Sequence, residues 1–169
     1  AFVSYLEIYN ENGYDLLDQR NRDGALEDMP KLSGVAEAAD GDVYVRGLSR
    51  CPVPSAEAAL NLLFLGDTKR AVSATSMNAA STRSHCIFTI LLEARRTDSD
   101  VIRRGKLHIV DLAGSERVGK SEAQGKQLRE AQYINTSLHF LEMVIVALQE
   151  KQTSSSSNSM SSRSHVPYR

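Results

Sequence analysis

An apolar segment of strand length, residues 107–110, runs directly into Asp111, and Gly114 stands three positions later. This D-x-x-G arrangement suits a sensor of a γ-phosphate. The carboxylate can hold a magnesium-bound water, and the glycine lets a backbone N–H approach the phosphate with no side chain in the way. A buried strand that ends in an ordinary turn would give the same pattern, so the segment needs independent support.

Support comes from a second polar segment, residues 78–85, which reads N-A-A-S-T-R-S-H and precedes an apolar run at residues 86–92. Its hydroxyl and amide groups can ligate magnesium and orient a water molecule, and Arg83 can pair with a carboxylate. A surface loop without a function rarely combines these groups so densely. The two segments together therefore indicate a phosphate-binding site.

Two other segments match functional patterns, and we reject both. Residues 114–121 satisfy the Walker A pattern G-x-x-x-x-G-K-S after a strand, but Asp111 and Glu116 would bring two carboxylates toward the phosphates. Residues 107–111 also read as the neighbouring Walker B strand, and one segment cannot occupy both places. Residues 158–165 match N-x-x-S-S-R-S-H, yet they lie in a serine-rich stretch and lead into no buried strand, so we attribute that match to chance.

The elements around these loops predict an α/β fold. β-Branched and aromatic residues predict a strand over residues 2–9, and residues 86–92 and 107–110 are apolar enough for strands covered on both faces. Ser55 is placed to cap a helix that ends at Gly66, and a further helical turn or two follows. These elements predict a central sheet sandwiched by helices.

A long helix is predicted over about residues 126–150. Its apolar residues fall at alternating spacings of four and three, which gives one stripe along a helix; they are Ile134, Leu138, Leu141, Ile145 and Leu148. Residues 19–42 are polar and contain several glycines, which indicates a solvated excursion with little structure. Residues 153–164 are rich in serine and predict a flexible loop insertion.

Composition limits the class of protein. With 169 residues, of which 41% are apolar and 24% charged, the chain suits one globular domain or part of one, and a net charge of −1 gives no signature of nucleic-acid binding. Cys51 and Cys86 lack C-x-x-C spacing, which favours a reducing compartment over a disulfide or zinc framework. We find neither a transmembrane segment nor a signal peptide. The chain starts without Met inside a predicted strand, so we expect an internal fragment.

The two loop motifs together resemble a pair of nucleotide-sensing loops found in one protein family. N-x-x-S-[S/T]-R-S-H before a strand, followed about thirty residues later by V-D-L-A-G-S-E-R, is similar to switch I and switch II of the kinesin family. The resemblance extends to S-Y-L-E-I-Y-N-E at residues 4–11, Y-I-N-T-S-L at residues 133–138 and H-V-P-Y-R at residues 165–169. Residues 84–90 and 138–142 look most similar to the kinesin-nine subfamily.

This resemblance implies a fold and a function. The fold would be part of a kinesin-type P-loop NTPase motor domain, α/β with a mostly parallel sheet and helices on both faces, and residues 1–169 would form one fragment of it. The function would be microtubule-stimulated ATP hydrolysis and microtubule-based movement, with ATP and Mg²⁺ as cofactors, microtubules as the partner and no nucleic acid. Because it lacks a phosphate-binding loop, the fragment alone should not bind ATP tightly.

The resemblance also implies a location. We expect a cytoplasmic protein of the microtubule cytoskeleton, with a cilium or flagellum suggested by subfamily analogy. Any homodimer would form through regions outside these residues.

The nucleotide site follows from motif position, with switch I at about residues 78–85 and switch II at about residues 110–117. Asn78, Ser81, Thr82 and Ser84 would face the γ-phosphate and magnesium, with Ser81 as a metal ligand, Asp111 acting through metal-bound water and Gly114 donating its N–H to the γ-phosphate. An Arg83–Glu116 salt bridge would close the switches, since an arginine–carboxylate fork is directional. The catalytic set is then Asn78, Ser81, Arg83, Gly114 and Glu116. Thr82 replaces the commoner serine but keeps a hydroxyl.

A microtubule-binding face is implied at about residues 118–150 and at the C-terminal motif. On charge alone this region reads as a solvated loop, because Glu116, Glu122 and Glu130 accompany the basic residues. In kinesins, however, this loop, the following helix and the H-V-P-Y-R segment meet the track. The resemblance therefore assigns tubulin contacts to Lys120, Lys126, Arg129, His165, Tyr168 and Arg169.

Two other functions stay open at this point. The product could be a truncated, nucleotide-independent microtubule-binding paralogue, and an in-frame upstream phosphate loop would argue against that. A Ras-like switch GTPase shares D-x-x-G, but it explains neither residues 78–85 nor the long helix, and no N-K-x-D motif is present.

Overall fold

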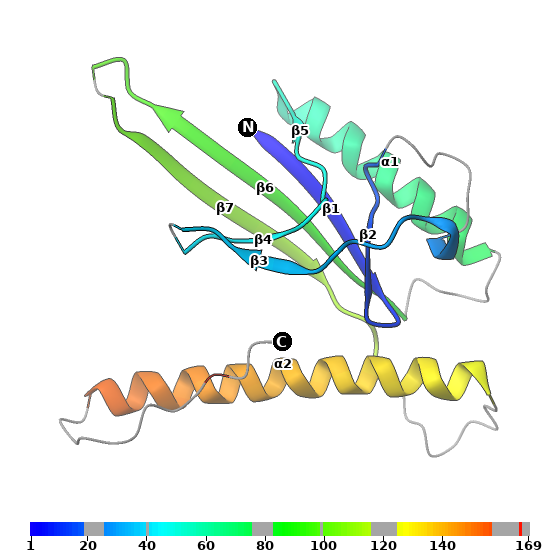
Figure 1. Cartoon of the computed structure of the whole chain (residues 1–169). Helices are drawn as coiled ribbons and strands as arrows, with labels where there is room; N and C mark the ends of the chain where they lie inside the picture. Colours follow the sequence, from blue (N-terminus) through cyan, green and yellow to red (C-terminus); the bar gives the residue numbers. More distant parts are fainter. Residues whose placement is uncertain are drawn as a thin grey trace. The chain divides into compact units, whose positions relative to one another are not determined.

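The computed structural model describes residues 1–18, 26–39, 41–75, 83–98, 100–115, 125–156 and 166 (Figure 1). The chain forms two compact units, Ala1–Gly114 and Ser115–Arg169. The first unit contains a β-sheet, a small hairpin and helix α1 (Ala56–Thr75), and the second contains helix α2 (Lys126–Ser156). The first unit therefore holds the described part of the motif at residues 78–85 and the D-x-x-G segment at residues 111–114.

The main sheet has the strand order β2-β1-β6-β7, and the short strand β5 also pairs with β1. Its strands are β1 (Phe2–Tyr9), β2 (Asn12–Asp15), β5 (Cys51–Pro52), β6 (His85–Arg95) and β7 (Ile102–Asp111). Strands β3 (Val35–Glu37) and β4 (Val43–Val45) form a separate antiparallel hairpin. The strand predicted over residues 2–9 and both apolar runs therefore lie in one sheet, as expected.

Every strand pairing in the described part of the chain is antiparallel. The expected mostly parallel arrangement is therefore not confirmed by these strands. Their connections give part of the reason, because Asn10 and Glu11, both with positive φ (48° and 61°), join β1 to β2, and only residues 96–101 separate β6 from β7 in the sequence. A parallel pair would need a crossover of roughly a dozen residues or more.

Helix α1 starts where the sequence predicts but continues farther. The Ala58 N–H donates to the Ser55 side-chain oxygen at 3.1 Å, which makes Ser55 the N-cap. The predicted end at Gly66 is wrong, because the helix runs to Thr75. Gly66 is buried against β1, and a Cβ added there would lie 2.3 Å from Cδ1 of Tyr5. The glycine therefore permits close approach of the helix to the sheet instead of ending the helix.

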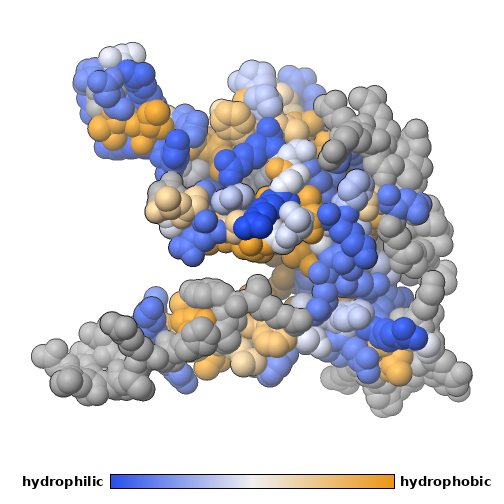
Figure 2. Space-filling view, in the orientation of Figure 1, coloured by the Kyte–Doolittle hydropathy of each residue, from blue (hydrophilic) through white to orange (hydrophobic). Residues whose placement is uncertain are grey.

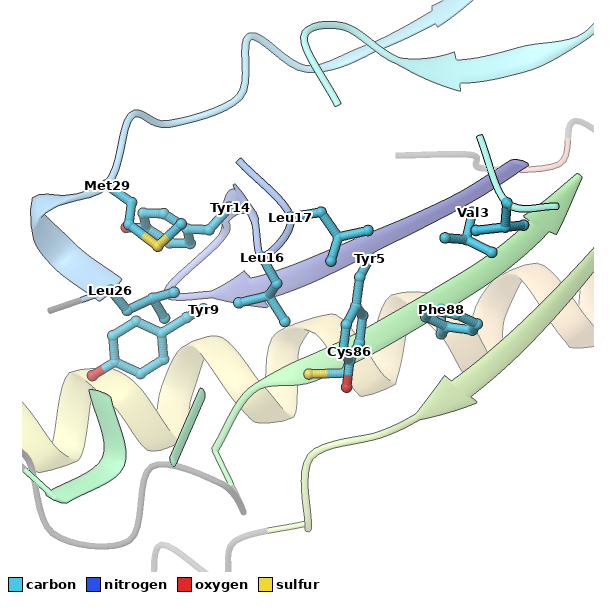
Figure 3. Close-up of a cluster of buried hydrophobic side chains, with 11 residues drawn as sticks. Val3, Tyr5, Tyr9, Tyr14, Leu16, Leu17, Leu26, Met29, Cys86 and Phe88 are labelled. Atoms are coloured by element: carbon cyan, nitrogen blue, oxygen red, sulfur yellow. The ribbon is translucent and has the colours of Figure 1, made fainter. Parts of the chain in front are cut away.

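The hydrophobic core lies between α1 and one face of the sheet. Figure 3 shows the buried side chains that the strands contribute to it. Alternate side chains of β1 belong to it, as a strand with one face toward the core requires: Val3, Tyr5 and Tyr9. Phe88 of β6 lies edge-to-face against Tyr5, with ring centroids 5.4 Å apart. The helix contributes Ala58, Ala59, Leu62 and Leu63.

The polar segment at residues 19–42 has more structure in its described part than the sequence predicts. It includes a 3-10 turn, η1 (Leu26–Asp28), and the side chains of Leu26 and Met29 are buried in the core beside Tyr14 (Figure 3). The backbone of Leu32 also donates to the Gly13 carbonyl at 2.9 Å, so this part of the segment is held to the first unit by both apolar burial and a hydrogen bond.

Strand β7 carries the sequence of a buried strand but lies at the surface. All of its residues are exposed, including the apolar Leu107, Ile109 and Val110, and hydrophobic residues are visible on the surface of the protein (orange in Figure 2). The prediction that both of its faces are covered is wrong, because every residue along the strand is exposed and no residue of β7 belongs to the described hydrophobic core. The prediction holds better for the start of β6, where Cys86 and Phe88 are buried.

The long helix predicted over about residues 126–150 is confirmed, and α2 extends six residues farther, to Ser156. The helix includes residues 153–156, which we expected in a flexible loop, and the Thr153 hydroxyl donates to the Glu150 carbonyl at 2.9 Å within it. The rest of the predicted serine loop lies outside the described residues. Neither α1 nor α2 has a stretch apolar enough to span a membrane, among the residues searched. Cys51 is partly buried, Cys86 is buried, and both are free thiols.

Replacing Gly66 by alanine should force α1 away from Tyr5. We expect the free energy of unfolding of a protein containing this segment to fall by about 1–3 kcal/mol, the usual range for overpacking, as measured by urea denaturation. Asn61→Ala, at an exposed position of the same helix, is the matched control and should cost less than about 0.5 kcal/mol. Equal effects of the two substitutions would contradict the close contact at Gly66.

Candidate functional site

The described ends of the two predicted loops meet at one end of the sheet. The register pairs Glu7 of β1 with Cys86 of β6, and Cys86 with Asp111 of β7, so these residues form a row across three strands. Strand β6 begins at this end and β7 finishes there. Antiparallel pairing therefore places the chain entering β6 beside the chain leaving β7, as a site built from both motifs requires.

Glu7 is a buried carboxylate in this row, with only 2% of its surface exposed. The Ser84 hydroxyl donates to Glu7 Oε1 at 2.6 Å, and Nε of Arg70 lies 3.8 Å from the same oxygen. Burial raises the pKa of Glu7, and the Ser84 hydrogen bond and the Arg70 charge act against that rise. Glu7 Oε2 has no hydrogen-bond partner among the described residues. The buried carboxylate therefore depends on the Ser84 and Arg70 contacts.

Arg70 connects this buried carboxylate to the predicted magnesium residue. Its Nη2 donates to Asp111 Oδ2 at 3.2 Å, which joins helix α1 to the end of β7. The Arg70 side chain is 14% exposed and that of Asp111 is 68% exposed. The arginine is thus held largely inside the protein, and it orients a carboxylate that is accessible from solvent.

His85 makes a direct contact between the two loop motifs. It is the first residue of β6, and its Nδ1 accepts a hydrogen bond from the backbone N–H of Ala113 at 3.0 Å. Both residues are buried, and burial lowers the pKa of His85. A neutral imidazole has the free lone pair that this contact needs.

The structure describes only part of the predicted nucleotide site. Asp111 and Gly114 are exposed and Arg83 is half-buried. Ser84, which is predicted to face the γ-phosphate and magnesium, is 1% exposed, and its hydroxyl donates to Glu7. Asn78, Ser81, Thr82 and Glu116 lie outside the described residues.

The predicted track-binding residues are described less fully. Arg129 is exposed on α2, and Lys126 is the first residue of that helix. Lys120, His165, Tyr168 and Arg169 lie outside the described residues.

Sequence reasoning missed Glu7 and Arg70 as members of this site, and it assigned no role to His85 within the motif at residues 78–85. A signal for Glu7 was present, since it alternates with the core residues Tyr5 and Tyr9 along β1 and so places a carboxylate on a buried face. Arg70 follows Gly66 by four positions, which puts both on the side of α1 that meets the sheet. The contact of His85 with Ala113 depends on the β6–β7 register, which has no local sequence signal.

The described donors can be tested against a magnesium nucleotide. Mg²⁺ usually keeps several waters and takes one or two carboxylates together with substrate phosphates. Asp111 offers a solvent-accessible carboxylate fixed by Arg70, and Gly114 offers an exposed backbone without a side chain. These two residues fit the predicted roles of holding metal-bound water and approaching a phosphate.

A comparison with models of protein families agrees with the resemblance found in the sequence motifs. The model of the kinesin motor domain matches residues 1–169. Among curated proteins, the chain is 43% identical to the human kinesin-like protein KIF9 over 99% of this chain and 20% of the relative. It is 47% identical to the kinesin-like protein KLP1 of Chlamydomonas reinhardtii over 89% of this chain and 19% of that protein. The chain thus spans about a fifth of the length of these relatives.

Solved structures agree with this family match. The chain is similar, with a TM-score of 0.75 and 40% identity, to a structure described as a fast kinesin, over 99% of this chain and 42% of that one. It is also similar to a KIF14 dimer bound to AMP-PNP in complex with a microtubule, with a TM-score of 0.78 and 33% identity over 99% of this chain and 45% of the other. The local fold described above therefore occurs within larger P-loop NTPase domains.

Arg70→Leu should leave the buried Glu7 carboxylate without its counter-charge. We expect a protein containing this segment to lose about 3 kcal/mol of stability, as for other broken buried ion pairs, in urea denaturation. Burial raises the pKa of Glu7, so the folded state binds the Glu7 proton more tightly than the unfolded state, and this contribution to stability is lost as pH rises through the raised pKa. Above that pKa Glu7 is ionised and needs the positive charge of Arg70. The loss caused by Arg70→Leu should therefore be greater at alkaline than at acidic pH.

Two controls sharpen that experiment. Arg95→Leu breaks the exposed pair with Asp100 and should cost less than about 1 kcal/mol. The double substitution Glu7→Leu with Arg70→Leu should cost less than Arg70→Leu alone, because no unpaired charge stays buried. A double variant that is as unstable as the two single variants combined would contradict the pairing.

Proposed function

The chain belongs to the kinesin motor domain family, and we propose that in its full-length protein it forms the nucleotide-sensing part of an ATP-driven microtubule motor. One observation carries the proposal: the start of β6 and the end of β7 lie side by side, and each continues into one of the two switch motifs. Two loops anchored this closely can surround one phosphate group. The rest of the phosphate site would come from other parts of the protein.

The roles within switch I and switch II follow from motif position. Bound ATP supplies the transferred phosphoryl group, and Mg²⁺ neutralises its charge. Asn78, Ser81 and Thr82 would face the γ-phosphate and the metal, with Ser81 as a metal ligand. Asp111 would hold metal-bound water, and the backbone N–H of Gly114 would donate to the γ-phosphate. The observed Arg70–Asp111 ion pair supports this assignment because it fixes the carboxylate at the end of β7.

Arg83 and Glu116 would form a salt bridge that exists only when the two switches close. A guanidinium–carboxylate fork is directional, so it can register closure of two loops around a nucleotide. The attacking water would then be positioned only in the closed state. Hydrolysis would be coupled in this way to the conformation of switch II.

The track would be bound by the segment that follows switch II. Helix α2 is connected to switch II through residues 118–125, so movement of the switch can be transmitted along the chain to the helix. Lys120, Lys126, Arg129, His165, Tyr168 and Arg169 would contact tubulin, whose acidic surface attracts basic residues. The similarity to a kinesin solved on a microtubule supports this proposal. A location on cytoplasmic microtubules follows, with cilia or flagella as the more specific proposal.

The ATPase assignment is tested by Glu116→Ala and by a charge exchange. In the full-length protein, Glu116→Ala and Arg83→Ala should each lower microtubule-stimulated ATP hydrolysis by about a hundredfold or more, in the range set for loss of positioning and electrostatic stabilisation. Arg83→Glu combined with Glu116→Arg should recover part of that loss, because the pair is restored in reverse. Glu93→Ala, at an exposed position of β6, is the control and should have no effect.

The outcomes separate the candidate functions. Hydrolysis that is insensitive to Glu116→Ala would overturn the proposed role of switch II. A full-length protein that binds microtubules equally with and without ATP, and does not hydrolyse it, would instead be a nucleotide-independent microtubule-binding protein.

The track-binding assignment is tested by Lys126→Ala combined with Arg129→Ala. Microtubule co-sedimentation of the full-length protein should show weaker binding, and the difference should be largest at low ionic strength, where surface charges are least screened. The matched control is Arg95→Ala with Arg103→Ala, which removes two exposed arginines from the β6–β7 hairpin. Equal weakening by both pairs would indicate a general effect of net charge and would contradict a specific face.

A further inference from the structure

The contact between His85 and Ala113 joins the two switch segments at a particular place. His85 is the last residue of the switch I motif and the first of β6, whereas Ala113 lies in switch II, two positions after β7 ends and directly before Gly114. Their hydrogen bond, from the Ala113 N–H to His85 Nδ1, spans 28 positions of sequence at a distance of 3.0 Å. It is a buried contact between a side chain and the backbone.

The β6–β7 ladder ends immediately before this contact. Cys86 pairs with Asp111 in the ladder, and among the described residues that follow, 112–115, no strand pairing continues. The imidazole of His85 therefore takes over as the acceptor for the backbone where the sheet stops. A leucine or another apolar side chain at this position would leave the buried Ala113 N–H without that acceptor.

The protonation state of His85 agrees with this role. Accepting a hydrogen bond at Nδ1 requires a lone pair there, and thus the neutral tautomer that carries its proton on Nε2. Burial lowers the pKa of His85, which keeps the ring neutral.

We propose that His85 is a positioning residue that fixes the backbone of switch II at Ala113, so that the adjacent N–H of Gly114 is presented to the γ-phosphate. The inference rests on the proposed function, since the role of Gly114 belongs to it. Orientation of one peptide plane restricts the next one, because only the two dihedral angles of Ala113 lie between its own N–H and that of Gly114. The side chain acts through this backbone contact and does not itself touch the nucleotide.

The acceptor can be removed or kept by substitution. His85→Leu removes it at similar size. His85→Asn places an amide oxygen at nearly the position of Nδ1, one bond from Cγ, and so keeps the acceptor. His108→Leu is the matched control, since His108 lies on the neighbouring strand β7 and contacts Thr89 through its own Nδ1, remote from Ala113.

The experiment uses the full-length protein with ATP, Mg²⁺ and microtubules. His85→Leu should lower kcat for ATP hydrolysis by about tenfold, the effect of losing one hydrogen bond in the hydrolysis-competent state, while KM for ATP changes less than about threefold. His85→Asn should recover most of kcat. Hydrogen–deuterium exchange of the peptide containing Ala113 should become faster in His85→Leu but not in His85→Asn or His108→Leu.

The result that overturns the inference is an unchanged kcat in His85→Leu, or equal losses in His85→Leu and His85→Asn, because the second pattern would reflect packing of the ring and not its acceptor. Unchanged exchange at Ala113 in His85→Leu would also overturn it. These results differ from failure of the proposed function, in which the unsubstituted protein shows no microtubule-stimulated hydrolysis; the inference would then fall with that function.

Discussion

The antiparallel register of β1, β6 and β7 is the constraint on which the rest of the site depends. It aligns Glu7, Cys86 and Asp111 in one row, and it brings the beginning of β6 to the end of β7. A shift of register by one residue would turn Glu7 and Asp111 to the opposite face, away from Arg70. Two loops that are distant in sequence become neighbours for this reason alone.

Helix α1 converts that arrangement into a fixed site. Gly66 allows the helix to lie directly on Tyr5, and Arg70, one turn later, reaches both Glu7 and Asp111. The ion pair with Glu7 is partly buried and that with Asp111 is largely exposed, so the inner contact holds the arginine while the outer one orients the carboxylate. Packing at one end of the helix thus determines the position of a charged group that would hold metal-bound water.

The motifs were the part of the site that the sequence revealed most clearly. Asp111, Gly114 and residues 78–85 could be identified because polar groups are combined densely in these segments and their spacing matches a known family. The strand at residues 2–9, the N-cap at Ser55 and the helix beginning at Lys126 were also predictable, since periodicity and capping are local signals. Contacts made through long-range pairing, such as those of Arg70 and of the motif residue His85, were missed because no local pattern specifies the partner.

The errors have physical causes that can be named. Gly66 was read as a helix end, but a glycine also serves where a helix must approach a strand closely. Strand β7 was expected to be covered on both faces because its residues are apolar, yet burial depends on which elements pack on the faces of a strand, and no residue of β7 joins the described hydrophobic core. Apolar side chains make a strand able to pack against another element, but they do not show which element covers it.

The most direct test is a structure of the full-length protein on microtubules with Mg²⁺ and a non-hydrolysable ATP analogue. The central claim is that the loops flanking β6 and β7 surround one nucleotide phosphate. We predict the γ-phosphate between residues 78–85 and 110–117, with the Gly114 N–H within hydrogen-bonding distance of it and Asp111 beside a metal-bound water. A nucleotide bound elsewhere, with Gly114 and Asp111 facing solvent, would contradict the claim.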